Sequence, residues 1–201
     1  MKSEITDKFI SAGMSRVETE GKARLVQLTS SFLERWTESE RANWVRCYVP
    51  GRIEVLGKHT DYAGGRSLLC AVERGICAVA APRADHLIRI ADVLREQECQ
   101  FIVSPDLDPR SENWAIYPKT VARRVACNFP GALSGMDMAF ASDLPRSAGM
   151  SSSSALMIAT YSLLERFNDL RKRPEHSRNT RNQEELAAYL GCVENGQTFG
   201  T

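Results

Sequence analysis

Two short segments of the sequence combine the residue types that chemistry on a small polar ligand requires. Residues 50–65 read PGRIEVLGKHTDYAGG, and residues 145–155 read PRSAGMSSSSA. The first segment sets charged and hydrogen-bonding side chains among glycines, which suits a site that must orient one of several similar hydroxyl groups. The second segment places small residues directly before an apolar helical pattern, which is typical of a loop whose backbone approaches a phosphate.

The polar residues of the first segment can each contribute to binding a polyol. His59, Asp61 and Tyr62 supply donors and acceptors, and the Asp61 carboxylate can accept hydrogen bonds from two hydroxyls at once. Gly64 and Gly65 allow the backbone to turn closely around a ring. The alternative interpretation is a surface turn that carries ordinary solvated charges.

The second segment has the composition of a phosphate-binding loop. A helix that begins after it presents unpaired N–H groups and the positive end of its dipole. Serine hydroxyls add donors to phosphate oxygens, and one hydroxyl could ligate Mg²⁺, which prefers oxygen ligands beside substrate phosphates. The alternative is a serine-rich helix cap, although the run from Ser151 to Ser154 is longer than one cap requires.

Composition limits the kinds of partner that the protein can have. The 201 residues are 43% hydrophobic and 25% charged, and 26 Lys+Arg against 25 Asp+Glu leave a net charge of +1. Because this balance gives no bulk field for nucleic acid or anionic lipid, we expect a small-molecule partner, no nucleic acid and no membrane. Six cysteines are scattered without a CxxC pair, and the N-terminus is too charged for a secretory signal, which indicates a cytoplasmic protein.

Hydrophobic periodicity predicts a mixture of helices and strands. An apolar pattern at 25–36 predicts an amphipathic helix that ends near Thr37, followed by two strands on either side of a turn at Pro50-Gly51. Further strands are predicted at 67–82, 86–92, 98–104 and 136–145, helices near 114–125, 156–167 and 182–196, and a polar surface linker at 171–182. The expected sheet is mostly antiparallel or mixed.

Taken together, the two segments resemble the motifs of the GHMP kinases, and among them the galactokinases. Their first motif looks like PGR-x-x-x-x-G-x-HTDY-x-GG and their second like P-x-x-x-G-(L/M)-SSS, while WAIYPK at 114–119 is similar to a third segment beside the nucleotide. The resemblance implies an α+β domain whose mixed β-sheet has helices on one face and a left-handed β-α-β unit. In full-length members a ferredoxin-like C-terminal domain follows.

The same resemblance implies ATP-dependent phosphorylation of the anomeric hydroxyl of galactose or a related monosaccharide, with Mg²⁺. Arg52 would be catalytic, beside the reacting hydroxyl and the phosphoryl group. Glu194 resembles the family's acidic Mg²⁺ ligand, and Ser153 would be its partner; the alternative interpretation of Glu194 is a solvated glutamate at a helix end. The sugar would contact Lys58, His59, Asp61, Tyr62, Gly64 and Gly65, and ATP would contact Pro145, Ala148, Gly149, Met150, Ser151, Ser152, Ser153, Ser154, Trp114 and Tyr117.

Two departures from the family pattern limit what the resemblance implies. The family's catalytic aspartate, expected shortly after Glu194, has no counterpart before Thr201, and the third glycine-rich motif is missing. We therefore expect residues 1–201 to be the sugar- and ATP-binding N-terminal domain, truncated before the C-terminal domain and inactive alone. Lys58 stands where galactokinases usually have glutamate, and Glu54 where they usually have asparagine, so the exact sugar stays open.

Two other functions remain compatible with these residues. One is a non-catalytic sugar- or nucleotide-binding regulator related to galactokinase. The other is a GHMP kinase for another sugar or a small alcohol, against which the polar density of HTDY argues.

Overall fold

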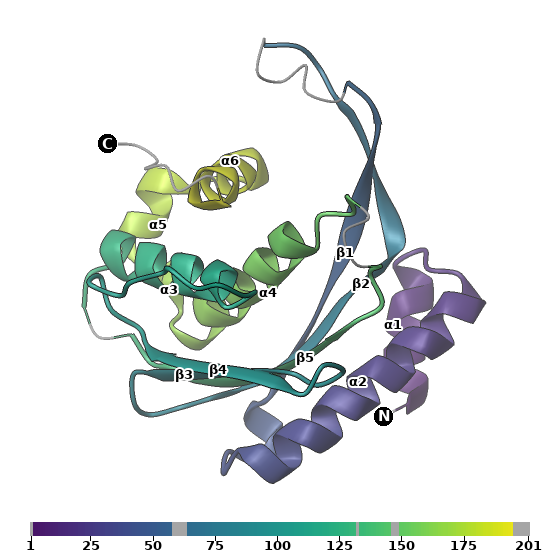
Figure 1. Cartoon of the computed structure of the whole chain (residues 1–201), viewed down its shortest axis with the longest axis horizontal. Helices are drawn as coiled ribbons and strands as arrows, with labels where there is room; N and C mark the ends of the chain where they lie inside the picture. The colour runs from purple at the N-terminus through teal and green to yellow at the C-terminus, as the bar shows by residue number, and fades with distance from the viewer. Residues whose placement is uncertain (1, 58–63, 132, 146–148, 195–201) are drawn as a thin grey trace.

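One mixed β-sheet organises the chain, and helices pack on both of its faces (Figure 1). The computed structural model describes residues 2–57, 64–131, 133–145 and 149–194. The elements of these ranges are, in chain order, α1 (Lys2–Ser11), α2 (Arg16–Trp36), η1 (Arg41–Asn43), β1 (Val45–Leu56), β2 (Leu68–Pro82), β3 (Leu87–Asp92), β4 (Gln97–Ile102), α3 (Ile116–Asn128), β5 (Met136–Ser142), α4 (Ser152–Phe167), η3 (Leu170–Lys172), α5 (Pro174–Asn179) and α6 (Gln183–Glu194).

The sheet has five strands in the order β1-β2-β5-β3-β4. Strand β3 pairs with β5 in parallel, and the other three pairs are antiparallel. The mixed sheet is therefore confirmed. The connection from β3 to its parallel neighbour β5 runs through β4 and α3, and its handedness stays a prediction.

Strand β2 explains why both faces of the sheet are covered. Successive side chains of a strand point to opposite faces, and the second half of β2 is apolar at every position from Ile76 to Ala81. Ile76, Ala78 and Ala80 join one buried cluster, whereas Cys77, Val79 and Ala81 join another. A strand that is apolar on both sides must be covered on both sides.

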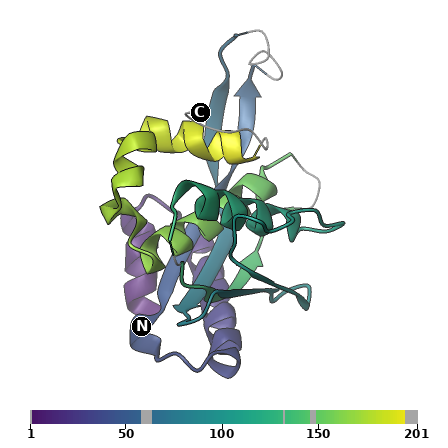
Figure 2. The same cartoon turned by 90° about the vertical axis from the view of Figure 1, so that its left-hand side faces the viewer.

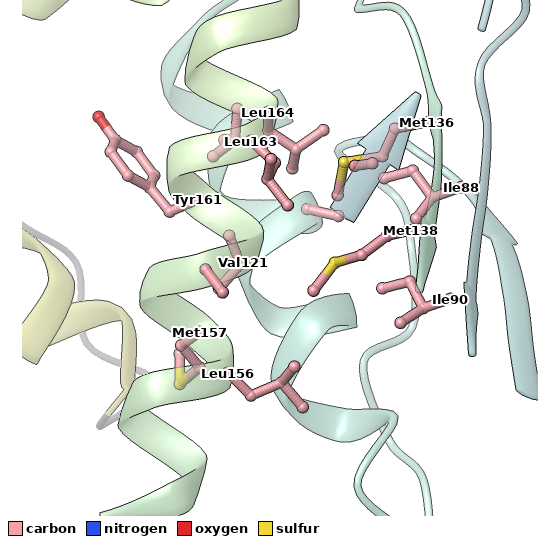
Figure 3. Packing of buried hydrophobic residues seen from close by; sticks show 14 of the residues in the cluster. Ile88, Ile90, Val121, Met136, Met138, Leu156, Met157, Tyr161, Leu163 and Leu164 are labelled. Atoms are coloured by element: carbon pink, nitrogen blue, oxygen red, sulfur yellow. The ribbon is translucent and has the colours of Figure 1, made fainter. Parts of the chain in front are cut away.

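Helices α3 and α4 cover the first of these faces, with α6 packed outside them. In Figure 3, Leu156 and Leu163 of α4 lie toward Met138 of β5, while Tyr161 points away from the sheet. The Tyr161 ring meets the ring of Tyr189 in α6 at a centroid distance of 5.9 Å. Helix α4 is thus buried between the sheet and α6, which fixes the position of its N-terminus.

Helix α2 covers the opposite face and corrects the expectation of helices on one face only. It begins after Ser15, whose hydroxyl accepts a hydrogen bond from the N–H of Glu18, and its buried stripe includes Val26 and Leu33. This stripe packs against Cys77, Val79 and Ala81. The expectation therefore holds for the helices after β2, whereas α1 and α2 form a further layer.

Strand β1 runs straight through Pro50-Gly51, so the predicted turn there is wrong. Strand β1 lies at the edge of the sheet and pairs only with β2, so it can accommodate the missing N–H of Pro50. The pairing of β1 with β2 is irregular between Pro50 and Arg52. Beyond Arg52, β1 and the start of β2 form a two-stranded ribbon that projects from the body (Figure 2).

Two further segments differ from their predictions. The expected linker at 171–182 is mostly helical, because it includes the end of η3 and all of α5. Pro174 occupies the first turn of α5, where its missing N–H costs nothing. Leu170, at the start of η3, is fully buried. No pattern predicts α1, which is a short charged helix. No helix of the described ranges combines the length and apolar character needed to cross a membrane.

Candidate active site

The two sequence motifs meet where β1 passes the loop that precedes α4. The backbone N–H of Arg52 donates to the carbonyl oxygen of Met150 at 3.3 Å. A Cβ at Gly51 would lie 2.4 Å from Cδ2 of Leu144 and 2.9 Å from the carbonyl oxygen of Met150. Glycine is therefore required here because two backbones approach closely, rather than because the chain turns.

Two residues of the loop before α4 have an uncommon backbone conformation. Gly149 and Ser151 both have left-handed backbone angles, with φ of 66° and 57°. Ser151 is the N-cap of α4, yet its side chain makes no capping hydrogen bond. A non-glycine residue with positive φ costs about 1 to 3 kcal/mol and is concentrated at functional sites. Left-handed residues directly before the N-terminus of a helix are typical of loops that bind anions.

Glu194, the last residue of α6, contacts the first turn of α4. Its carboxylate accepts a hydrogen bond from Ser153 Oγ at 3.2 Å, and Ser154 Oγ lies 2.7 and 2.8 Å from its two oxygens. Ser153 and Glu194, which the resemblance pairs, are therefore neighbours. Ser154 is the additional partner of Glu194, and its hydroxyl is buried in the interface.

The donor set around Glu194 fits a magnesium ion. Mg²⁺ prefers oxygen ligands and usually takes one or two from the protein, with the rest from waters and substrate phosphates. Ser153 Oγ and the Glu194 carboxylate supply two such oxygens. Over the described ranges, no group of three or more His, Cys, Asp or Glu side chains converges on one point. A site here would be completed by phosphate oxygens rather than by further side chains.

A cavity of about 360 Å³ opens beside the start of α4. Five of the residues that the sequence assigns to ATP line it, namely Trp114, Tyr117, Pro145, Ser152 and Ser153. The indole N–H of Trp114 donates to Gln97 Oε1 at 3.0 Å, and its ring meets Phe140 edge to face at 5.3 Å. These contacts hold the Trp114 side chain in place as one wall of the cavity.

The sequence did not indicate several of the residues that line this cavity. Asp92, Arg95 and Gln97 belong to the β3-β4 hairpin, and Asp92 is buried in an ion pair with Arg95. No local motif marks them, because they reach the cavity through strand pairing. Ile76, Phe140, Ser142, Leu144 and Leu156 complete the lining, and each lies in or just after an element predicted from its apolar pattern.

The remaining predicted residues lie elsewhere. Arg52 is exposed on β1, and Gly64 and Gly65 lie in the connection at the far end of the ribbon, so none of the three lines the cavity. Gly149, Met150, Ser151 and Ser154 belong to the loop and first turn described above. Lys58, His59, Asp61, Tyr62 and Ala148 lie outside the described residues.

Two family models match parts of the chain. Residues 30–82 match the galactokinase galactose-binding signature, and residues 117–200 match the GHMP kinase N-terminal domain. The chain has the fold of the GHMP kinase N-terminal domain, and residues 117–200 are similar to that family. Its N-terminal half carries the signature of the galactokinases.

Several relatives by sequence are galactokinases. A galactokinase of Roseiflexus sp. (strain RS-1) is 38% identical over 127 residues, and one of Actinobacillus pleuropneumoniae serotype 5b (strain L20) is 32% identical over 123 residues. Each match covers 61% of this chain and 32% of the relative. The matched part thus spans about a third of the length of these curated relatives.

Solved structures share the fold. A Lactococcus lactis galactokinase complexed with galactose has a TM-score of 0.70 at 22% identity, covering 86% of this chain and 42% of that chain. The Methanococcus jannaschii mevalonate kinase has a TM-score of 0.61 at 15% identity, covering 79% of this chain and 49% of that chain. Because kinases of different acceptors share it, the fold alone does not select a substrate.

Proposed function

We propose that this protein is a galactokinase-like kinase that transfers the terminal phosphoryl group of ATP to the anomeric hydroxyl of galactose or a related monosaccharide. The observation that carries the proposal is the junction of the motifs, where Arg52 on β1 bonds to Met150 in the loop before α4. Catalysis of phosphoryl transfer depends almost entirely on positioning and electrostatic stabilisation. The contact of Arg52, in the first motif, with the proposed phosphate-binding loop supports this chemistry, and so do the names of the relatives.

In this proposal the base of ATP enters the cavity, and its phosphates bind at the start of α4. The walls formed by Trp114 and Tyr117 suit an aromatic base, and the N–H groups of the loop suit phosphate oxygens. The proposed nucleotide contacts remain Pro145, Ala148, Gly149, Met150, Ser151, Ser152, Ser153, Ser154, Trp114 and Tyr117. Mg²⁺, held by Ser153 and Glu194, would neutralise charge on the phosphates when bound.

The sugar would bind at the residues that follow β1. His59, Asp61 and Tyr62 would orient the reacting hydroxyl, with Gly64 and Gly65 close to the ring and Lys58 at its far end. Arg52, one strand position from the Gly51 junction, would offset the charge that develops during transfer. These assignments rest on residue chemistry and on the galactose-binding signature that covers 30–82.

We further propose that residues 1–201 bind ligands but do not sustain turnover alone. About two thirds of the length of the curated relatives lies outside the match. The sugar hydroxyl also needs a proton acceptor, and we assign none of the residues 1–201 to that role.

The test is a coupled assay for ADP release by the full gene product with galactose, galacturonate, arabinose, a heptose phosphate and mevalonate as acceptors. We expect sugar-dependent turnover that requires Mg²⁺, and none with mevalonate. Turnover with mevalonate alone would instead assign a small-alcohol kinase. Galactose binding without turnover by the full product would replace the kinase with a sugar-binding regulator.

A further inference from the structure

A lysine from α2 is buried behind the proposed nucleotide site. The side chain of Lys22 has no exposed surface, and its ammonium group pairs with the Asp143 carboxylate and with Glu18 at 3.2 Å. A buried ammonium group is costly unless it is paired, so the position of Lys22 is tied to that of its partners.

Asp143 stands where β5 ends and the second motif begins. Its Oδ1 accepts a hydrogen bond from the N–H of Gly75 at 2.7 Å, and its own N–H donates to the carbonyl oxygen of Gly75 at 3.3 Å. The carboxylate therefore bridges β2 on one side and Lys22 of α2 on the other.

The residues beside Asp143 belong to the cavity. Ser142 Oγ donates to the Gly75 carbonyl oxygen at 3.3 Å and accepts from the N–H of Leu144 at 3.2 Å. The lining of the cavity includes Ser142, Leu144 and Pro145. The side chain of Leu144 also occupies the space that a Cβ at Gly51 would need. A displacement of Asp143 would therefore shift Ser142 and Leu144, which line the same cavity as Ser152 and Ser153 of α4.

The helix that supplies Lys22 lies mostly outside the matched family models. These cover 30–82 and 117–200, whereas α1 and the first two thirds of α2 precede residue 30. We infer that Lys22 is a positioning residue, through which the N-terminal helices set the start of the phosphate-binding loop and thereby the affinity for MgATP. The inference rests on the proposed function, because it concerns the same nucleotide site.

Two variants break the Lys22–Asp143 contact in different ways. Lys22→Met removes the ammonium group. Asp143→Asn keeps an oxygen for the Gly75 N–H but turns a second donor toward Lys22. Should Lys22→Met fail to fold, Asp143→Asn still tests the contact, because the bond to Gly75 is retained.

Arg89 offers a matched control at the other end of the same interface. Its guanidinium donates to the carbonyl oxygen of Trp36 at 2.9 Å, pairs with Asp137, and stacks over the Trp36 ring at 4.7 Å. It therefore also ties α2 to the sheet, but it does not line the nucleotide cavity. Arg89→Met should lower stability without changing nucleotide binding.

The experiment is isothermal titration calorimetry of MgATP into residues 1–201, at a temperature where circular dichroism shows each variant folded. We expect Lys22→Met and Asp143→Asn to raise the Kd about 3- to 30-fold, and Arg89→Met to leave it within about twofold. Unchanged affinity in both loop-side variants, or an equal loss in Arg89→Met, would overturn the inference. Absence of MgATP binding by the unaltered chain would instead overturn the proposed function.

Discussion

The backbone N–H of Arg52 donates to the carbonyl oxygen of Met150, and this bond joins two motifs that lie far apart in the sequence. It is possible because Gly51 has no side chain to separate β1 from the loop. The relationship explains why a glycine occurs in the middle of a strand. It also places the proposed phosphate-binding loop beside the proposed catalytic arginine.

Gly51→Ala is predicted to disrupt this junction. The added methyl group would lie 2.4 Å from Leu144 and 2.9 Å from the Met150 carbonyl oxygen, so the loop must move. We expect a loss of about 1 to 3 kcal/mol in the free energy of unfolding, together with weaker MgATP binding. Chemical denaturation and calorimetry measure the two effects.

Gly191→Ala is the control for that substitution. Gly191 lies in α6, and a Cβ there would meet no atom within 4 Å. Alanine should therefore stabilise the helix by about 0.5 to 1 kcal/mol and leave MgATP affinity unchanged. Equal behaviour of the two variants would show that the Gly51 junction has no special importance.

Ser153→Ala is predicted to weaken only the metal-dependent part of ATP binding. Its hydroxyl lies 3.2 Å from the Glu194 carboxylate, and we propose that both hold Mg²⁺. A lost bond to a charged partner corresponds to about a tenfold or greater rise in the Kd for MgATP. In EDTA, the variant and the unaltered protein should bind ATP equally. An equal loss in both conditions would remove Ser153 from the metal site.

Local patterns predicted the elements that depend on local sequence. The apolar periodicity of 156–167 found α4, and the small residues before it marked the loop, because a helix start has a short-range signature. The hairpin residues Asp92, Arg95 and Gln97 could not be assigned to the site. Their place in the cavity follows from β3 pairing with β5 across the sheet, which no spacing along the chain encodes.

At Pro50-Gly51, by contrast, the local sequence predicted a feature, a turn, that the structure does not have. The dipeptide is a strong turn signal, but its role here depends on Leu144 and Met150, which approach from a distant part of the sequence. The contact of Glu194 with Ser153 was expected from the family resemblance, whereas its closer contact with Ser154 was not. A buried hydroxyl in a run of serines has no signal that separates it from its exposed neighbours.

Substrate choice is predicted to depend on Lys58. A cation at the far end of the sugar favours a carboxylate or phosphate over a neutral hydroxymethyl group, whereas an acidic acceptor favours the hydroxymethyl group. Lys58→Glu should therefore raise the galactose-to-galacturonate ratio of kcat/KM about tenfold or more. No change in that ratio, with galactose preferred throughout, would mean that Lys58 faces solvent or pairs with Glu54.

The buried thiol of Cys77 and the half-buried thiols of Cys47 and Cys99 are predicted to resist alkylation in the folded protein. Burial raises the pKa of Cys47 to about 11 and those of Cys77 and Cys99 to about 12, whereas Cys70 and Cys127 are exposed. At pH 8, iodoacetamide should modify the exposed pair first, as mass spectrometry of the peptides would show. Rapid native modification of Cys77 would contradict the burial.

The same pKa values predict how stability changes in alkali. Because the folded pKa values exceed the ordinary thiol value of 9.0, the stabilising contribution is fully present below about pH 9. It is lost as the pH rises toward 11 to 12. Thermal melts from pH 8 to 11 should show a falling Tm, and substitution of Cys47, Cys77 and Cys99 by alanine should flatten that fall.

The most direct measurement is a crystal structure of residues 1–201 with Mg²⁺ and a non-hydrolysable ATP analogue. The proposed function predicts the base in the cavity beside Trp114 and the phosphates against the N–H groups of Gly149 to Ser154. The metal should lie about 2.1 Å from Ser153 Oγ and from a Glu194 oxygen. A nucleotide bound elsewhere, or a metal held without either residue, would contradict the assignment of this loop as the phosphate site.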